Sequence, residues 1–252
     1  FSVRVLMNGQ NRQTKTGAAV YGDPGDRARL AGLMRALGPV LLGVALAGAA
    51  LGLLAVSPAA AGAVLLLAAA TFWVAARRSA ARVRAFFKGA RGEERVAAVL
   101  ATLPPGFAVF HGVDGGPGMR LAARGDIDHI VIGPAGVWVI ETKCWDGRVD
   151  VDAAAGAVLF EGAPPSRNPV QQAARLTARV AEALARRLPA APPVRALLCF
   201  AGSGFAGGLE TVGGVTVCGI DRLRETVAAA TGAARLTEDD RTRIVEILKQ
   251  AL

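Results

Sequence analysis

The stretch that decides the fold reads Gly125-Asp126-Ile127-Asp128-His129-Ile130-Val131-Ile132-Gly133-Pro134-Ala135-Gly136-Val137-Trp138-Val139-Ile140-Glu141-Thr142-Lys143. Its two halves are rich in β-branched residues and are separated by a Gly-Pro-Ala-Gly break, a pattern that predicts an antiparallel hairpin. With the turn centred on the Pro-Ala pair, Asp128 lies opposite Glu141 and Asp126 lies opposite Lys143.

The alternation of side chains along a strand predicts which residues of this hairpin share a face. The face that carries Asp128, Glu141 and Lys143 also carries four apolar residues, Ile130, Ile132, Val137 and Val139. The other face carries Ile127, Val131, Trp138 and Ile140. A strand that is apolar on both faces is usually buried, and directly opposed Cβ atoms lie roughly 4.5–5.5 Å apart. We therefore expect two carboxylates and one ammonium group close together at the end of a buried hairpin.

Carboxylates this close repel each other and have raised pKa values unless a cation joins them. Lys143 supplies one positive charge. A hard divalent cation such as Mg²⁺, which prefers oxygen ligands, would supply two more. The alternative interpretation is a structural Asp–Lys–Glu cluster at a strand end, and the charges taken alone favour it.

The order of these residues, an Asp followed one strand later by Glu-x-Lys, resembles the metal-binding signature of the restriction-endonuclease-like (PD-(D/E)xK) nucleases. The whole run, continued by Cys144-Trp145-Asp146-Gly147, resembles the NERD (nuclease-related) domain. The resemblance implies that Asp128 and Glu141 bind Mg²⁺ or Mn²⁺. It also implies that Lys143 orients or deprotonates the attacking water and offsets the charge of the phosphate.

Two further motifs resemble parts of the same family. Gly89-x-x-Gly92-Glu93-x-x-Val96-x-x-x-Leu100 resembles its opening motif and places Glu93 in the site. On chemistry alone, Glu93 is an acid in the first turn of a helix, where the helix dipole favours it. Asn168-Pro169-x-x-Gln172 resembles the motif of a later helix, which implies that Gln172 contacts the catalytic lysine or the substrate. A solvent-facing amide is the alternative for Gln172.

The order of expected elements predicts an α/β fold, with a restriction-endonuclease-like mixed sheet flanked by helices. A strand at 107–113 precedes the hairpin, and a small strand pair at 148–152 and 157–160 follows it. Helix 168–188 and strands 194–201 and 212–219 complete the sheet, and helices 221–230 and 237–252 close the chain. Gly202-Ser203-Gly204-Phe205-Ala206-Gly207 matches G-x-G-x-x-G, but the dinucleotide fingerprint requires a helix directly afterwards. Because a strand is expected there, we predict a flexible loop and no nucleotide site.

Residues 38–76 contain no charged residue, and Ser57-Pro58 divides them into two halves of nearly the ~20 residues that a membrane-spanning helix needs. Arginines flank the run on both sides, which predicts a two-pass hairpin with both ends in the cytoplasm. A buried helical hairpin of a soluble protein and a processed signal segment are the alternatives. The expected organisation is a basic, loosely ordered segment 1–37, the hairpin 38–76, a basic juxtamembrane helix 77–88 and the nuclease-like domain 89–252. The chain begins with Phe1 and not Met, so a missing N-terminal piece stays open.

The net charge is +9, which reflects either a GC-rich genome or attraction to a polyanion, nucleic acid or an anionic lipid surface. The chain has three cysteines without a Cys-x-x-Cys pair and two histidines, which argues against a zinc site and against disulfides. His129 is expected to be structural, because it points away from the face of Asp128.

The sequence therefore predicts a nuclease anchored in the cell membrane, with its catalytic domain in the cytoplasm. It would hydrolyse DNA with Mg²⁺ or Mn²⁺, using Glu93, Asp128, Glu141, Lys143 and Gln172. The alternative function is a catalytically silent, membrane-tethered module that binds nucleic acid or a protein; a pure membrane-anchored scaffold is a third, weaker one. The sequence predicts no oligomeric state and does not distinguish DNA from RNA.

Overall fold

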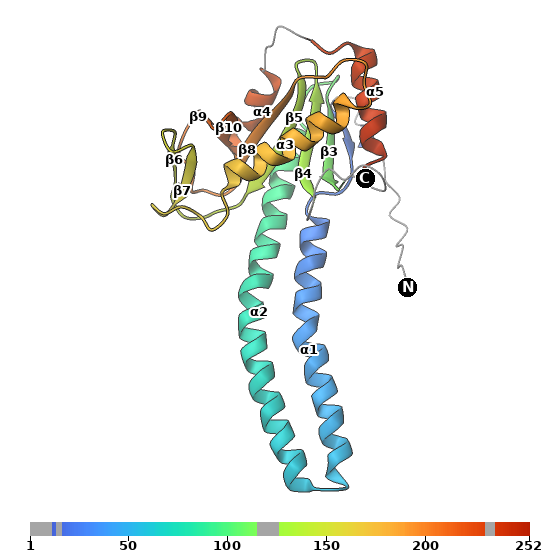
Figure 1. Ribbon diagram of the computed structural model, residues 1–252, viewed down its shortest axis with the longest axis vertical. Helices are drawn as coiled ribbons and strands as arrows, with labels where there is room; N and C mark the ends of the chain where they lie inside the picture. Colours follow the sequence, from blue (N-terminus) through green and yellow to red (C-terminus); the bar gives the residue numbers. More distant parts are fainter. Residues whose placement is uncertain (1–11, 14–16, 115–125, 230–234) are drawn as a thin grey trace. The chain divides into compact units, whose positions relative to one another are not determined.

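The structure is a computed structural model that describes residues 12–13, 17–114, 126–229 and 235–252. The chain divides into two compact units (Figure 1). One unit is Asp26–Ala90, and the other joins Phe1–Gly25 to Arg91–Leu252.

The smaller unit is built from two long helices, α1 (Asp26–Leu54) and the first part of α2 (Pro58–Leu100). The predicted break at Ser57-Pro58 is confirmed, because α2 begins at Pro58. The juxtamembrane helix and the helix of Glu93, expected as two helices, are both parts of this one helix of 43 residues. Gly32–Leu54 and Pro58–Arg77 have mean hydropathies of 2.2 and 2.0, and each is long and apolar enough to cross a membrane.

The larger unit contains a mixed sheet of eight strands in the order β1-β2-β3-β4-β5-β8-β10-β9. The strands are β1 (Arg12–Gln13), β2 (Ala19–Tyr21), β3 (Ala108–Val113), β4 (Ile127–Gly133), β5 (Gly136–Lys143), β8 (Val194–Phe200), β9 (Leu209–Val212) and β10 (Val215–Gly219). The separate pair β6 (Val149–Asp152) and β7 (Ala157–Phe160) forms the predicted small hairpin. The helices are α3 (Pro169–Ala185), α4 (Ile220–Ala228) and α5 (Glu238–Lys249). The α/β class with a mixed sheet flanked by helices is thus confirmed.

Two parts of the sheet differ from the prediction. Residues 12–13 and 19–21, assigned to the loosely ordered segment 1–37, form β1 and β2, and β2 pairs with β1 and in parallel with β3. Helix α1 also begins inside this segment, at Asp26. The strand expected at 212–219 is β10 (Val215–Gly219), and Val212 is instead the last residue of β9 (Leu209–Val212), a strand that the sequence did not predict. Gly213 and Gly214 have φ values of 55° and 77°, and these left-handed conformations reverse the chain between the two strands.

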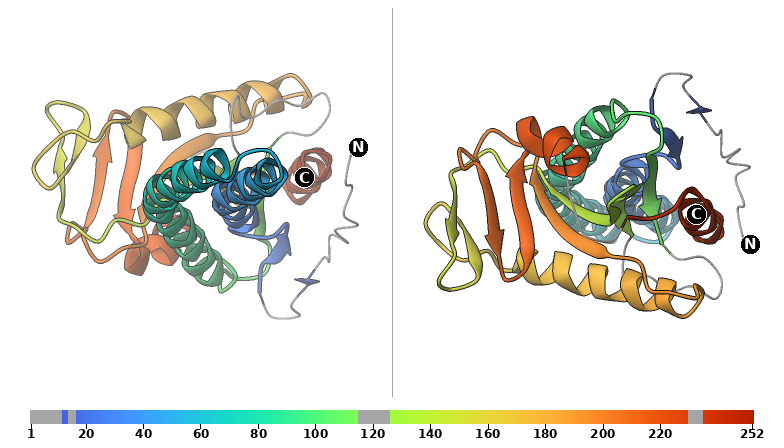
Figure 2. Two further views of the ribbon diagram at one scale, coloured as in Figure 1. Left: turned by 90° about the horizontal axis from the view of Figure 1, so that it is seen from below. Right: turned by 90° about the horizontal axis from the view of Figure 1, so that it is seen from above.

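The hairpin β4–β5 lies in the middle of the sheet with the predicted register. His129 pairs with Ile140, and Gly133 pairs with Gly136 beside the turn. Helix α3 covers one face of the sheet and α4 the other (Figure 2). The core on the α3 side contains Ile130, Ile132, Val137 and Val139, and the opposite core contains Val131, Trp138 and Ile140. Ile127 is the exception to the predicted faces, because it packs into the core on the α3 side.

The glycine-rich loop 202–207 is explained by close packing. A Cβ atom added at Gly202 would lie 1.8 Å from the carbonyl oxygen of Trp145, and one at Gly204 would lie 1.7 Å from that of Gly147. Only glycine permits two backbones to approach this closely. The loop leads into β9 and not into a helix, as the sequence predicted.

Gly92 allows α2 to pack against the end of β5. A Cβ atom added at Gly92 would lie 2.7 Å from the Cβ of Cys144, which directly follows β5. A Cβ atom added at Gly89, about one turn earlier, would have no atom within 4 Å. The two glycines of the motif therefore differ in function, and Gly92 sets how closely Glu93 approaches the sheet.

Replacing Gly92 by Ala should destabilise the protein by about 1–3 kcal/mol, because the added methyl group overpacks the contact with Cys144. Gly89→Ala is the matched control and should be neutral or stabilising by up to about 1 kcal/mol, because Ala is the better helix former. Denaturant unfolding of the full chain in detergent measures both. Equal effects of the two substitutions would contradict the packing constraint at Gly92.

Candidate active site

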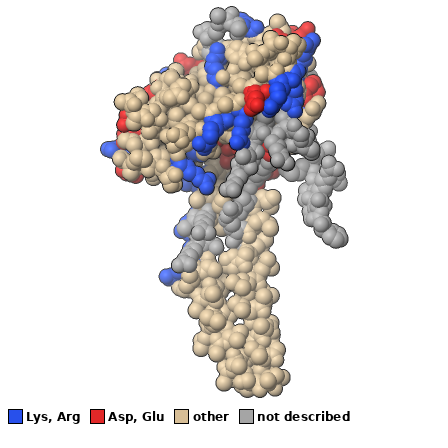
Figure 3. All heavy atoms as spheres, in the orientation of Figure 1, with Lys and Arg blue, Asp and Glu red and all other residues tan. Residues whose placement is uncertain are grey.

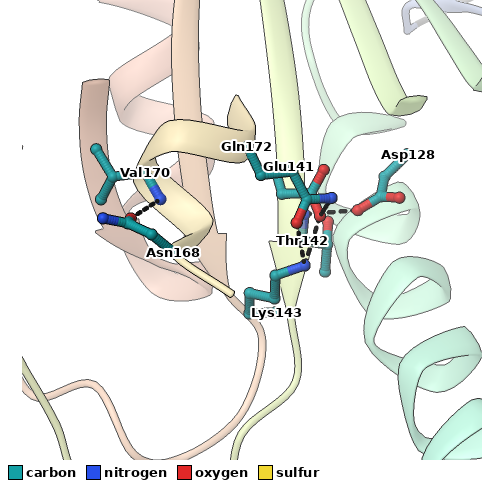
Figure 4. A network of polar contacts seen from close by, with 7 residues as sticks. All are labelled: Asp128, Glu141, Thr142, Lys143, Asn168, Val170 and Gln172. Atoms are coloured by element: carbon teal, nitrogen blue, oxygen red, sulfur yellow. Dashed lines mark hydrogen bonds and ion pairs between the residues drawn. The ribbon is translucent and has the colours of Figure 1, made fainter. Parts of the chain in front are cut away.

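The charged residues predicted for the hairpin meet at one end of β4 and β5 (Figure 4). Lys143 Nζ donates a hydrogen bond of 2.5 Å to Glu141 Oε1. Asp128 Oδ2 accepts a hydrogen bond of 2.7 Å from the backbone N–H of Thr142 on the neighbouring strand. The side chain of Glu141 is only 3% exposed, and that of Lys143 is 22% exposed. The cluster is therefore largely withdrawn from water, although its lysine reaches the surface.

Gln172 joins this cluster from α3. The helix begins at Asn168, whose side chain accepts hydrogen bonds from the backbone N–H groups of Val170 and Gln171. One turn later, Gln172 Nε2 donates to Glu141 Oε1 at 2.6 Å, and Lys143 Nζ donates to Gln172 Oε1 at 3.4 Å. Gln172 thus contacts both members of the ion pair, which excludes the alternative of a solvent-facing amide.

The carboxylates of the site are costly to ionise together. Burial raises the pKa of Asp128 well above its ordinary value, and the nearby charges of Glu141 and Glu93 raise it further. Burial also raises the pKa of Glu141, although Lys143 opposes this shift. For Lys143, burial acts to lower the pKa, but the attraction of Glu141 and Asp128 outweighs it and the pKa is raised. Lys143 therefore stays protonated at neutral pH.

Glu93 reaches the site from α2. Its pKa is raised to about 7 by burial and by the negative charges of Asp126 and Glu141, against a hydrogen bond from the backbone of Gly25. The interpretation of Glu93 as an acid in a first helical turn is wrong, because α2 begins at Pro58 and runs continuously past it. Helix-dipole stabilisation fades within the first turn and does not explain this position.

Asp126 is a further acidic residue of the site to which the sequence analysis gave no role. It precedes β4, and its charge raises the pKa of both Glu93 and Glu141. A sequence signal for it exists, because Asp126 and Asp128 are two residues apart and so share a face of an extended chain. The site thus contains four carboxylates around one lysine.

One buried atom of this cluster points to a cation. Glu141 Oε2 is buried and has no hydrogen-bond partner in the described part of the chain. Across the same residues, no group of three or more His, Cys, Asp or Glu side chains is arranged to hold a metal ion. Mg²⁺ is commonly held by only one or two carboxylates, with waters and substrate phosphates as its other ligands. Asp128 and Glu141 fit this partial set of ligands.

The two histidines form a separate pair. His111 and His129 are buried opposite each other on β3 and β4, with 2.7 Å between their Nδ1 atoms. Burial lowers the pKa of His111 to about 4, and burial together with His111 lowers that of His129. Both rings are therefore neutral near pH 7. The two rings contact each other edge to face.

Comparison with known protein families agrees with this geometry. Residues 88–201 match the family model described as the nuclease-related domain, NERD. This part of the chain, 114 of its 252 residues, is similar to a nuclease-related domain. Its matched range contains all five predicted site residues, Glu93, Asp128, Glu141, Lys143 and Gln172. No curated protein and no solved structure matches the chain.

Asp128→Asn should stabilise the metal-free nuclease-related domain at neutral pH. The folded-state pKa of Asp128 is raised, so ionisation destabilises the wild-type fold as pH rises above the unfolded value of 3.8. Asn has no charge and so removes this cost of ionisation, and its Oδ1 can still accept a hydrogen bond from the Thr142 N–H. We expect the unfolding temperature in EDTA at pH 7.5 to rise by roughly 2–4 °C, the shift that about 1 kcal/mol produces in a protein of this size.

The gain should shrink as the pH falls towards 3.8, where Asp128 becomes protonated even in the unfolded chain. Asp150→Asn is the control, because Asp150 lies on the surface in an exposed pair with Arg148. Mg²⁺ should raise the unfolding temperature of the wild type more than that of Asp128→Asn. A loss of stability in Asp128→Asn without metal would show that the acidic charges stabilise the fold.

Proposed function

We propose that this protein is a membrane-anchored nuclease that hydrolyses the phosphodiester bonds of DNA with Mg²⁺ or Mn²⁺. The observation that carries the proposal is the buried, unpartnered Oε2 of Glu141, which lies in a nuclease-related domain beside Asp128 and a protonated Lys143. A structural ion pair alone would leave no reason to bury that oxygen, since unpaired buried polar atoms cost free energy.

In the proposed mechanism, Asp128 and Glu141 hold the divalent cation. When bound there, the ion would supply Lewis-acid stabilisation of the phosphate and a lower pKa for the attacking water. Gln172 fixes the Glu141 carboxylate through the hydrogen bond from its Nε2, and so keeps Oε2 directed away from Lys143.

Lys143 and Glu93 take different parts in this scheme. Lys143 stays protonated, so it acts by holding the water and offsetting the negative charge of the phosphate, and it does not act as the base. Glu93 has a pKa of about 7 and can therefore exchange a proton at neutral pH. This division refines the expectation from the sequence, which left Lys143 either role.

The proposed membrane anchor is the hairpin of α1 and α2. Its two apolar stretches have lengths and hydropathies typical of spanning helices. The arginines beside both stretches favour a two-pass arrangement with the nuclease-related domain in the cytoplasm. The net charge of +9 lies in residues 1–88, because residues 89–252 carry 18 basic and 18 acidic side chains. Nucleic acid as the partner of the domain is therefore supported by the nuclease-related match and not by net charge.

The test is a cleavage assay on the full chain in a non-ionic detergent, with single- and double-stranded DNA and RNA in Mg²⁺, Mn²⁺ or EDTA. We expect cleavage of DNA that requires the metal. Glu141→Ala and Lys143→Ala should each lower the rate by roughly 10²- to 10³-fold, the usual cost of removing one charge-stabilising group.

Glu246→Ala and Lys249→Ala are matched controls, because these residues form an exposed Glu–Lys ion pair on α5. Both should cleave at the wild-type rate. If the folded wild type binds DNA without cleaving it, the proposed nuclease function is refuted and the alternative of a catalytically silent binding module is supported. A wild type that binds neither metal nor nucleic acid would show that the charged cluster is structural.

A further inference from the structure

The outer face of α3 carries a stripe of arginines. The opposite face of the helix packs into the core through six buried residues, Pro169, Val170, Ala173, Val180, Ala183 and Leu184. At about 100° per residue, Arg175, Arg179 and Arg186 project within about 40° of one another. Basic side chains (blue) lie along α3 in the space-filling view, with acidic atoms (red) among them (Figure 3).

The arginine stripe begins at the candidate active site. Gln172, which contacts Glu141 and Lys143, projects about 20° from Arg179 on the same side of α3. With a rise of 1.5 Å per residue, Arg175 follows Gln172 by about 4.5 Å along the helix axis and Arg186 follows it by about 21 Å. A strand of duplex DNA carries one phosphate per about 3.4 Å of axis, so this length corresponds to about six phosphates.

The stability of α3 does not account for the central arginines. Arg186 pairs with Glu182 at 2.9 Å and lies just past the last turn, where a cation complements the helix dipole. Within the described residues, Arg175 and Arg179 make no ion pair and lie in the middle of the helix. Like charges four residues apart on a helix repel by a few tenths of a kcal/mol, so an external anion would stabilise the pair.

We propose that Arg175, Arg179 and Arg186 form a track for the nucleic-acid backbone, which leads the substrate strand along α3 into the active site. This inference rests on the proposed nuclease function. The stripe is continuous with Gln172, which contacts Lys143. A polymeric phosphate can bind the stripe and Lys143 at once, and a single lipid head group cannot, so the continuity favours the polymer. Arginine–phosphate contacts position a strand without reading its bases, so the track recognises the backbone irrespective of sequence.

The test compares Arg175→Gln/Arg179→Gln/Arg186→Gln with the wild type, as full chains in a non-ionic detergent with EDTA to prevent cleavage. Binding of a fluorescent DNA duplex of about 20 base pairs is followed by anisotropy over a range of salt concentrations. We expect binding at 0.1 M salt to weaken roughly ten-fold or more and the salt slope to fall by about 2–3, because each lost phosphate contact removes about 0.9 from the slope. The corresponding triple Arg→Lys variant should retain most of the binding, since it keeps the charges.

The matched control is Arg222→Gln/Arg243→Gln/Lys249→Gln, which removes the same charge from exposed positions on α4 and α5. An equal loss in this control would overturn the track and reduce the effect to net charge. Unchanged DNA binding of the α3 variant would also overturn it, even if calorimetry showed that the variant no longer binds dihexanoyl phosphatidylglycerol, which would make the stripe a lipid surface.

The result is separable from that of the cleavage assay. A wild type that cleaves DNA while the α3 variant binds as tightly as the wild type refutes the track alone. A wild type that binds without cleaving, with binding lost in the α3 variant, supports the track and refutes the nuclease. If circular dichroism shows that the triple variant is unfolded, Arg179→Gln and Arg179→Lys are compared instead, with loss in the first and retention in the second expected.

Discussion

The arrangement of the candidate active site depends on the buried carboxylate of Glu141. Burying a charge is unfavourable unless it is paired and hydrogen-bonded, and Glu141 Oε1 meets this requirement with both Lys143 and Gln172. The ammonium group comes from the same strand, and the amide comes from α3. Satisfying one oxygen therefore fixes the start of α3 against the end of β5. The second oxygen, Oε2, has no partner among the described residues and is the natural position for a cation.

A second constraint comes from the packing of α2 against the same strand end. Gly92 lets the helix approach Cys144, and the next residue, Glu93, carries its carboxyl group towards Asp126 and Glu141. Burial, and after it the neighbouring negative charges, raises the pKa of Glu93 and Asp128 and disfavours the metal-free, fully ionised site. A fold that tolerates this repulsion is suited to a divalent cation, whose binding offsets it. The same helix also contains the apolar stretch Pro58–Arg77.

Local signals in the sequence predicted the centre of this site well. The Gly-Pro-Ala-Gly turn determines the register of β4 and β5, and that register brings Asp128 beside Glu141 and Lys143. Asn168-Pro169 predicts the start of α3 and hence the place of Gln172 one turn later. These inferences succeeded because each depends on residues that are close in the chain. The raised pKa of Glu93 was not predictable from local chemistry. Residues close in the chain suggested the first turn of a helix, whereas its environment is made by distant segments around Gly25 and Asp126. Strand β2 was not predicted for the same reason, since its three residues form a strand by pairing with β1 and with the distant β3.

The central claim is that Asp128 and Glu141 form a divalent cation site. The most direct test is an anomalous difference map from crystals of the full chain grown with Mn²⁺. The account predicts a peak about 2.1 Å from Glu141 Oε2, the distance expected for a small hard cation, with an oxygen of Asp128 as a second ligand and the Lys143 pair retained on Oε1. A map without a peak at saturating Mn²⁺, or a peak bound elsewhere with Glu141 Oε2 still unliganded, would contradict it.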